Sequence, residues 1–151
     1  MKLVVKHFND LKLNELVDIY KLRVSVFVVE QKCPYQEVDY VDKVAYHLWL
    51  EDDDGIEAYA RVLPKGTTSE EASIGRIIAK KRRCGLGTKI VNEAIKVAKD
   101  KFGETKLKIE AQVYAKSLYE KCGFVQTSEP FLEDGIPHIY MVYESNKICK
   151  N

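Results

Sequence analysis

One stretch of this chain constrains its fold more than any other: a mostly apolar run, a basic turn and two glycines ahead of a segment with helical periodicity. The apolar run covers residues 73–79, basic residues occupy positions 80–83, and Gly85 and Gly87 come next. Glycines let backbone N–H groups approach a ligand without a Cβ in the way, and the first N–H groups of a helix have no partner inside it. The stretch is therefore predicted to be a strand, a turn and a helix start that bind an anion such as a phosphate.

Two common nucleotide-binding turns do not fit this stretch. A P-loop requires G-x-x-x-x-G-K-[ST], and the chain has no first glycine at that distance. A Rossmann turn requires G-x-G-x-x-G, and position 90 is isoleucine. On the glycines and the charge alone, a solvent-exposed basic turn before a helix remains an alternative.

Length and charge narrow the class of protein. The 151 residues are enough for one domain with a buried core, and we expect residues 1–151 to form a single domain. The 24 Lys and Arg nearly balance the 23 Asp and Glu, so charge gives no case for a nucleic acid or a membrane as partner. No apolar run approaches the ~20 residues of a membrane helix, and nothing resembles a secretion signal, so we expect a cytoplasmic protein. Cys33, Cys84, Cys122 and Cys149 lack metal-ligand spacing, so we expect reduced cysteines and no metal site.

Periodicity predicts strands and helices in alternation along the rest of the chain. Strands are expected at 3–8, 45–50, 56–63, 73–79, 107–111, 124–128 and 138–143, and helices at about 11–25, 86–98 and 113–122. The β-branched run from Val24 to Val29 should loosen or end the first helix. Residues 30–43, which are rich in carboxylates, are interpreted as an irregular, exposed segment. The order of elements predicts a mixed sheet with helices on its faces.

Two motifs carry a resemblance to a known family. Arg82, Gly85 and Gly87 resemble the R-x-x-G-x-G acyl-CoA motif of the GNAT superfamily of N-acyltransferases, and residues 112–124 resemble its N-x-x-A-x-x-x-Y-x-x-x-G-F segment, with Gln112 where Asn is usual. Further segments are similar to the ElaA-like branch, namely 23–31, 33–37, 47–48, 74–76, 111–112 and 133–138. The stretch between Arg76 and Gly85 is about two residues shorter than in that branch. The resemblance implies a single GNAT-like α/β domain with a mixed, mostly antiparallel, twisted sheet flanked by helices on both faces.

The resemblance also implies a reaction: transfer of an acetyl group from acetyl-CoA, as co-substrate, to an amine by direct attack in a ternary complex. The implied donor-binding residues are Ile77, Ile78, Arg82, Arg83, Cys84, Gly85, Leu86, Gly87, Thr88, Gln112 and Tyr119. Backbone N–H groups near Ile77 and Ile78 would bind the oxyanion, and Tyr119 would interact with the leaving thiolate. The ordinary pKa of a phenol is ~10 against ~8.5 for a thiol, so full proton transfer is uphill by ~2 kcal/mol and a hydrogen bond would carry much of the effect.

The attacking amine must lose its proton, and several side chains are candidates for the base. The carboxylates are Glu30, Glu37, Glu110 and Glu133, and the imidazoles are His47 and His138. We favour Glu30, His47 and His138 as catalytic residues on the substrate side, because they lie in branch-specific motifs. A solvated charge or a structural hydrogen bond is the alternative for each. Arg23, on the apolar face of the first helix, is expected either to form a buried ion pair with a carboxylate or to bind substrate.

Other functions stay open at this point. The chain could bind acyl-CoA without catalysing transfer, or it could resemble acyl-homoserine-lactone synthases, which share an Arg-x-x-Val-Phe segment; the short length and the Tyr119 segment argue against the latter. A cysteine nucleophile would need an activated thiolate, and no histidine is close in sequence to Cys84 or Cys122. The acidic residues at 30–42 and 133–134 would suit a cationic acceptor, such as a polyamine or a peptide amine, or form ordinary surface. The sequence is compatible with a monomer and with a homodimer as the oligomeric state.

Overall fold

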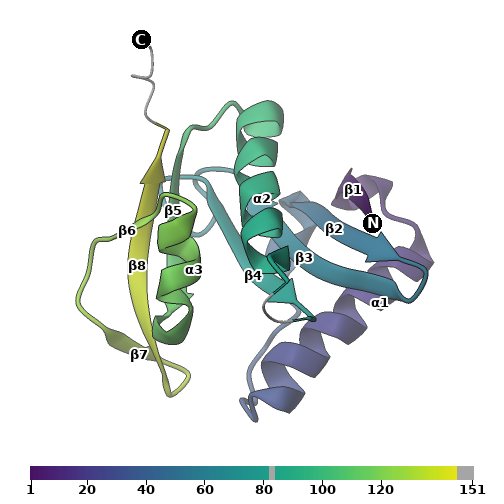
Figure 1. Cartoon of the computed structure of the whole chain (residues 1–151), viewed down its shortest axis with the longest axis horizontal. Coiled ribbons are helices and arrows are strands. Elements are labelled where there is room, and N and C mark those ends of the chain that lie inside the picture. Colours follow the sequence, from purple (N-terminus) through teal and green to yellow (C-terminus); the bar gives the residue numbers. More distant parts are fainter. Residues whose placement is uncertain (82–83, 146–151) are drawn as a thin grey trace.

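The computed structural model describes residues 1–81 and 84–145 and has the GNAT-like α/β fold (Figure 1). The strands are β1 (Lys2–His7), β2 (Tyr46–Asp52), β3 (Gly55–Leu63), β4 (Ser73–Ala79), β5 (Lys106–Gln112), β6 (Val125–Gln126), β7 (Phe131–Glu133) and β8 (Ile136–Glu144). The helices are α1 (Leu13–Val24), α2 (Leu86–Phe102) and α3 (Lys116–Lys121). Shorter helical turns cover Phe8–Asp10, Ser25–Glu30, Tyr40–Val44 and Val113–Ala115.

The strands form two antiparallel sheets that are joined at one end. The first sheet has the order β1-β2-β3-β4, and the second has β5-β8-β6 with β7 paired to β8. One parallel bridge, between Ala72 and Leu107, connects them, and the N–H of Lys108 donates to the carbonyl of Ala72 over 3.0 Å. Because this bridge lies at the start of both strands, β4 and β5 are free to separate further along, and Figure 1 shows them diverging as the arms of a V.

A β-bulge interrupts the pairing of β4 with β3. Tyr59 pairs with Ile78 and Arg61 pairs with Gly75, so β4 has one more residue than β3 between these two positions. Arg76, inside this interval, has a φ of 53°, in the left-handed region that few residues other than glycine adopt. The bulge therefore changes the direction of β4 at the point where it leaves β5.

Helices cover both faces of the first sheet, and the alternation of side chains along β2 and β3 separates two cores. Trp49 and Tyr59 pack with Ile19 of α1 and with Ile78 on one face. Their neighbours on the other face join the larger core beneath α2 and α3, which includes Leu48, Leu50, Ala58, Ala60, Val62, Ile90, Val91 and Ala94. The layers predicted from the sequence are confirmed, although the single sheet we expected is split into two.

The observed elements agree closely with the predicted ones. The helix of residues 13–24 does loosen at the β-branched run, because Ser25–Glu30 continues it as a π-helical turn. The prediction of an exposed segment at 30–43 is wrong for two of its carboxylates: Glu37 and Asp42 are only 2% and 0% exposed, whereas other residues of the segment, such as Glu30 and Tyr40, are exposed. Strand β7 was not predicted, because it has three residues and too little pattern to detect.

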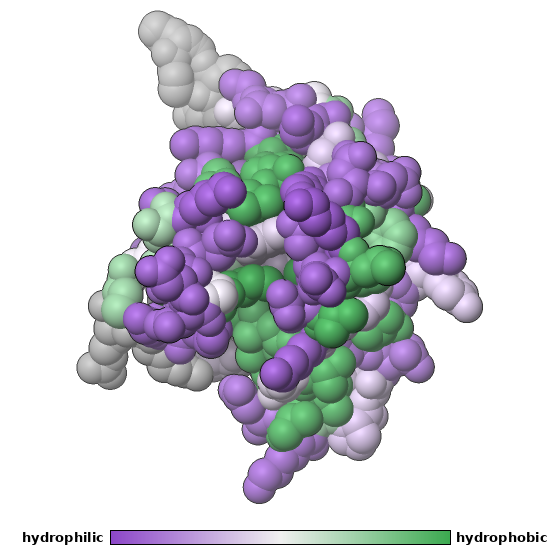
Figure 2. Space-filling model, turned by 90° about the vertical axis from the view of Figure 1, so that its right-hand side faces the viewer, coloured by the Kyte–Doolittle hydropathy of each residue, from purple (hydrophilic) through white to green (hydrophobic). Residues whose placement is uncertain are grey.

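Hydrophobic side chains are exposed on the side of the molecule that carries β1 and α1, and Figure 2 shows them among charged groups. In these two elements they are Leu3, Leu13 and Val17. Over residues 1–81 and 84–145, none of the helices combines the length and the apolar character that a membrane span requires.

Candidate active site

Two cavities meet where β4 separates from β5. The larger, of about 1330 Å³, lies among α1, the β2–β3 hairpin, the end of β4 and the starts of α2 and α3. The smaller, of about 400 Å³, lies among β4, β5, the β7–β8 hairpin and the segment after α1. Among residues 1–81 and 84–145, five line both of them: Phe27, Ile77, Tyr114, Ala115 and Tyr119. A molecule in one cavity can therefore reach a molecule in the other only past these side chains.

The start of α2 forms one wall of the larger cavity, and its two glycines are needed for different reasons. Gly85 has a φ of 75°, and a Cβ added to it would meet no heavy atom of the described residues within 4 Å, so it is needed for its conformation. A Cβ on Gly87 would lie 3.3 Å from the methyl groups of Leu118, so Gly87 is needed for the close approach of α3. The N–H of Lys89 donates to the carbonyl of Gly85 over 3.0 Å, as at the start of a regular helix. Because the N–H groups of the first turn have no partner inside a helix, this end of α2, which lines the larger cavity, is suited to bind an anion.

The predicted donor-binding residues divide between the two cavities. Those that line the larger one are Ile77, Ile78, Gly85, Leu86, Gly87, Thr88 and Tyr119. Three lysines that were not among the predicted donor-binding residues line it too, namely Lys80, Lys81 and Lys121. Gln112 lines the smaller cavity instead, where its Nε2 donates to Oε1 of Gln31 over 3.2 Å. Cys84 is exposed and lines neither cavity. Arg82 and Arg83 lie outside the described residues.

Tyr119 lies at the junction of the cavities. Its ring packs edge to face on Phe124, with 5.7 Å between the ring centroids, and the residue is 9% exposed. A packing role and a role in the reaction are therefore compatible for Tyr119, since the same side chain contacts the core and lines both cavities. Burial raises the pKa of the Tyr119 phenol well above its usual range. Tyr119 thus stays a neutral hydrogen-bond donor at neutral pH.

Acidic groups gather in the smaller cavity. Glu110 of β5 and Glu133 and Asp134 of the β7–β8 hairpin all line it, as does His138 of β8. Partial burial, and then the negative charge of Glu133, raise the pKa of Glu110. The Nδ1 of His138 is 2.7 Å from the carbonyl of Ile136 and must donate to it, so Nε2 is the nitrogen of the neutral ring that can accept a proton.

The structure brings His138 to this cavity but not the other two residues that we favoured as catalytic. Glu30 is exposed and lines the larger cavity. His47 is fully buried and lines neither: its Nδ1 accepts from the hydroxyl of Tyr59 at 2.6 Å, and its Nε2 donates to the carbonyl of Asp42 at 3.0 Å. Burial lowers the pKa of His47, which keeps the ring neutral. We therefore correct the placement of His47 on the substrate side, because both ring nitrogens are used inside the core.

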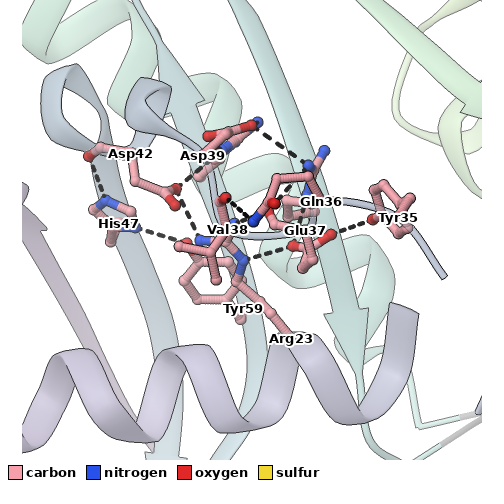
Figure 3. Close-up of polar contacts among 11 residues, drawn as sticks. Arg23, Tyr35, Gln36, Glu37, Val38, Asp39, Asp42, His47 and Tyr59 are labelled. Atoms are coloured by element: carbon pink, nitrogen blue, oxygen red, sulfur yellow. Dashed lines mark hydrogen bonds and ion pairs between the residues drawn. The ribbon is translucent and has the colours of Figure 1, made fainter. Parts of the chain in front are cut away.

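A buried ionic network lies behind the smaller cavity and joins α1 to the segment after it (Figure 3). Arg23 donates from Nε to Glu37 at 2.8 Å and from Nη1 to Asp42 at 2.8 Å. Arg61 of β3 donates to the same oxygen of Asp42 at 2.9 Å and to Asp39 at 2.9 Å. Of the two roles open for Arg23, the buried ion pair is the one observed. The network as a whole was not predicted from the sequence, although charged residues within branch-specific or apolar segments were a signal for it.

The cysteines of the described part take no obvious catalytic position. Cys122 is buried with its Sγ 3.9 Å from the carbonyl of Thr88, and burial raises the pKa of its thiol. Cys33 lines the smaller cavity, and its Sγ is 3.6 Å from the carbonyl of Asp134. Cys149 lies outside the described residues. Within residues 1–81 and 84–145, no three His, Cys, Asp or Glu side chains are grouped so that they could hold a metal ion.

Two sheets that diverge from one bridge, a bulged β4 and a glycine-bearing helix start facing the resulting cleft define the GNAT-like class of acyltransferase folds. The chain belongs to the GNAT acetyltransferase family, because the family profile described as "Acetyltransferase (GNAT) domain" matches residues 15–145. Family membership supports an acyltransferase that takes its acyl group from CoA.

Similar proteins agree with this assignment over nearly the whole chain. A UPF0039 protein of Schizosaccharomyces pombe is 42% identical over 95% of this chain and 97% of its own length. Protein ElaA of Escherichia coli is 32% identical over 91% and 93%, and its crystal structure has a TM-score of 0.87. The structure of an acyl-CoA N-acyltransferase from Pseudomonas aeruginosa is 38% identical, with a TM-score of 0.87 over 95% of this chain and 99% of that one. The acyl-homoserine-lactone synthase LasI, at 14% identity and a TM-score of 0.73 over 95% and 89%, shares the fold alone.

Proposed function

We propose that this protein is a single-domain N-acetyltransferase that transfers an acetyl group from acetyl-CoA to a cationic amine by direct attack in a ternary complex. The observation that carries the proposal is the meeting of two cavities at Ile77 and Tyr119. Two substrates that enter from opposite sides would have their reacting atoms at this junction, and no covalent intermediate on the protein is required. The cytoplasmic location expected from the sequence remains a prediction.

The larger cavity suits the donor. Carboxylates of α1, of the turn after it and of the β2–β3 hairpin also line this cavity, so only part of it is positive. At the start of α2, the N–H groups together with Lys80, Lys81 and Lys121 offer positive charge to the pyrophosphate of acetyl-CoA. The acyl group would then extend along β4 to the bulge, where Ile77 has no register partner in β3. An unpaired backbone N–H at a bulge is a suitable donor for the oxyanion that develops on the acetyl carbonyl.

The smaller cavity suits the acceptor. Glu110, Glu133 and Asp134 bring negative charge to it, which favours an amine that arrives as a cation. Arg61 and Arg76 also line it, but both form ion pairs with carboxylates of the buried network. That amine must lose a proton before it attacks, and the raised pKa of Glu110 makes this carboxylate a better base than an ordinary one. His138, through Nε2, is the second candidate for the base.

Tyr119 would act on the leaving group. Because burial raises the pKa of its phenol, full proton transfer to the CoA thiolate is even less favourable than ordinary pKa values indicate. We therefore propose that Tyr119 donates a hydrogen bond to the thiolate as the C–S bond breaks, and that the proton arrives later from solvent or from the base.

The test is release of free CoA thiol from acetyl-CoA in the presence of monoamines, polyamines and peptide amines, with an amine-free control that corrects for the protein's own cysteines. Calorimetry measures acetyl-CoA binding in parallel. Amine-dependent release is the expected result. Binding with no release on any amine would favour a module that binds acyl-CoA without transferring the acyl group, and absence of binding would refute both functions.

A further inference from the structure

Arg76 adopts an unfavourable backbone conformation at the centre of the candidate active site. Its φ of 53° lies in the left-handed region, where a side chain with a Cβ is disfavoured. It belongs to the bulge of β4 and lines the smaller cavity, and the next residue, Ile77, lines both cavities. Strained backbone of this kind persists only where the surrounding structure holds it in place.

The side chain of Arg76 provides that hold. Its Nε donates to Oε2 of Glu37 at 2.7 Å, and its Nη2 lies 3.4 Å from the carbonyl of Glu37 and 3.6 Å from Oδ2 of Asp39. Arg76 has a side-chain exposure of 23%, whereas that of Glu37 is 1%, so the carboxylate end of the pair is well shielded from solvent. An ion pair with this geometry restricts where the backbone of Arg76 can lie.

Glu37 is itself firmly anchored. The same Oε2 accepts from Nε of Arg23 at 2.8 Å, the hydroxyl of Tyr35 donates to Oε1, and the carbonyl of Glu37 accepts from Nη2 of Arg23 at 3.0 Å. Figure 3 shows Glu37 between Tyr35 on one side and Arg23, which rises from α1, on the other. Through these contacts the bulge of β4 is tied to α1 and not only to its neighbouring strand.

We propose that the ion pair of Glu37 with Arg76 acts as a clamp that holds the bulge of β4 and so sets the position of the Ile77 backbone toward the acyl carbonyl. Glu37 and Arg76 are then positioning residues, which act through Ile77 and do not contact the reacting atoms. The catalytic part of this inference rests on the proposed function, whereas the structural part, that the clamp sets the register of β3 against β4, does not.

Replacing Arg76 by alanine and by glycine separates the backbone conformation from the charge. Both variants remove the guanidinium, but glycine adopts a positive φ readily and alanine does not. We expect Arg76→Ala to lower kcat on the order of 10²-fold, since misplacement of a site by about 1 Å has effects of that size. Arg76→Gly should keep a kcat at least about tenfold above that of Arg76→Ala, and the KM for acetyl-CoA should change little in either.

Lys32 supplies a matched control. It also has a positive φ, of 51°, it is exposed, and it lines neither cavity. Lys32→Ala and Lys32→Gly should therefore leave turnover unchanged, even if alanine lowers stability at this position. A drop in turnover with Lys32→Ala similar to that with Arg76→Ala would mean that general destabilisation, and not the bulge, accounts for the effect.

Three results would overturn the proposal. Equal losses of kcat in Arg76→Ala and Arg76→Gly would mean that the guanidinium itself acts on a substrate. An increase in the KM for the amine, with kcat unchanged, would lead to the same conclusion. Unchanged turnover in both variants would mean that no clamp is needed. If the wild-type protein acetylates no amine, the proposed function fails, but NMR measurement of the β3–β4 register still tests the clamp, which predicts a shifted register in Arg76→Ala and the native one in Arg76→Gly.

Discussion

Asp42 offers the sharpest test of how the segment after α1 is held. It is 0% exposed, and its Oδ1 accepts from Nη1 of Arg23 at 2.8 Å and from Nη1 of Arg61 at 2.9 Å. Its Oδ2 has no hydrogen-bond partner in the part of the chain that the structure describes. Asp42→Asn keeps the shape and an acceptor oxygen but removes the charge. The other carboxylates of the network still face the two arginines, so the substitution weakens the ion pairs without exposing them.

The expected cost follows from these contacts. A hydrogen bond to a charged group contributes about 1.5–3 kcal/mol against about 0.5–1.5 kcal/mol for a neutral one, so weakening two of them costs about 2–3 kcal/mol. The amide introduced by Asp42→Asn would place an NH2 group where Oδ2 has no partner, and an unsatisfied buried donor adds about 1–2 kcal/mol. The total of about 3–5 kcal/mol equals the usual cost of breaking a buried ion pair, and it corresponds to a fall in Tm of roughly 6–20 °C for a chain of 151 residues.

The pH dependence of this loss gives an independent check. Burial alone would raise the pKa of the Asp42 carboxyl, but the hydrogen bond and charge of Arg23, followed by those of Arg61, outweigh burial and lower it. A carboxyl whose pKa is lower in the folded state stabilises the protein at pH values above its ordinary pKa of about 3.9. This stabilisation is lost as the pH falls through the folded-state pKa. The difference between wild type and Asp42→Asn should therefore shrink below about pH 4.

Urea denaturation at pH 7 and at pH 3 measures both effects, with Glu120→Gln as the control. Glu120 forms an exposed pair with Lys116 at 3.9 Å, and loss of such a pair should cost under about 0.5 kcal/mol. A loss below about 1 kcal/mol for Asp42→Asn, or a difference that does not shrink in acid, would show that the network is not held by charge as we argue.

Three further predictions concern the site and the core. Tyr119→Phe should lower kcat but leave acetyl-CoA affinity by calorimetry nearly unchanged, and an unaltered kcat would remove Tyr119 from the mechanism. Gly87→Ala should weaken acetyl-CoA binding, because its Cβ would lie 3.3 Å from Leu118, and a second substitution, Leu118→Ala, should restore part of the affinity unless the contact is irrelevant. Since burial lowers the pKa of His47, the free energy of unfolding of the wild type should fall as the pH drops below about 6.5. Urea denaturation at several pH values should show a weaker pH dependence for His47→Gln, and an identical dependence would contradict the neutral buried ring.

Most of the fold could be predicted from the sequence because strands and helices leave local patterns. The alternation in 107–111 predicted β5, and the helical spacing after Gly87 predicted α2. The split between β4 and β5 could not be predicted in this way, since it depends on a single bridge from Ala72 to Leu107, 35 positions along the chain. Pairing across such a separation has no local signature.

The residues of the candidate site could also be predicted only in part, because motifs indicate residue types but not the orientation of their side chains. Motif resemblance indicated Ile77, Gly87, Tyr119 and His138, and the structure gathers these residues around two cavities that meet; their roles stay predictions. His47 was placed on the substrate side because a motif records which residue occurs and not which way its side chain faces. The left-handed conformation of Arg76 could not be predicted for a similar reason, since glycine is the residue type that indicates a positive φ and an arginine does not.

The order of elements, the glycine turn before α2 and the family could all be recognised in the amino-acid sequence. The elements depend on neighbours within a few positions, through the periods of 2 and 3.6 residues that strands and helices impose. The partial burial of the acidic segment at 30–43 depends instead on tertiary contacts, because a carboxylate enters a core only where cations from distant elements meet it. Glu37 is buried since Arg23 and Arg76, 14 and 39 positions away, both reach it. The same contacts tie α1 to the bulge of β4, whose Ile77 lies at the junction of the two cavities.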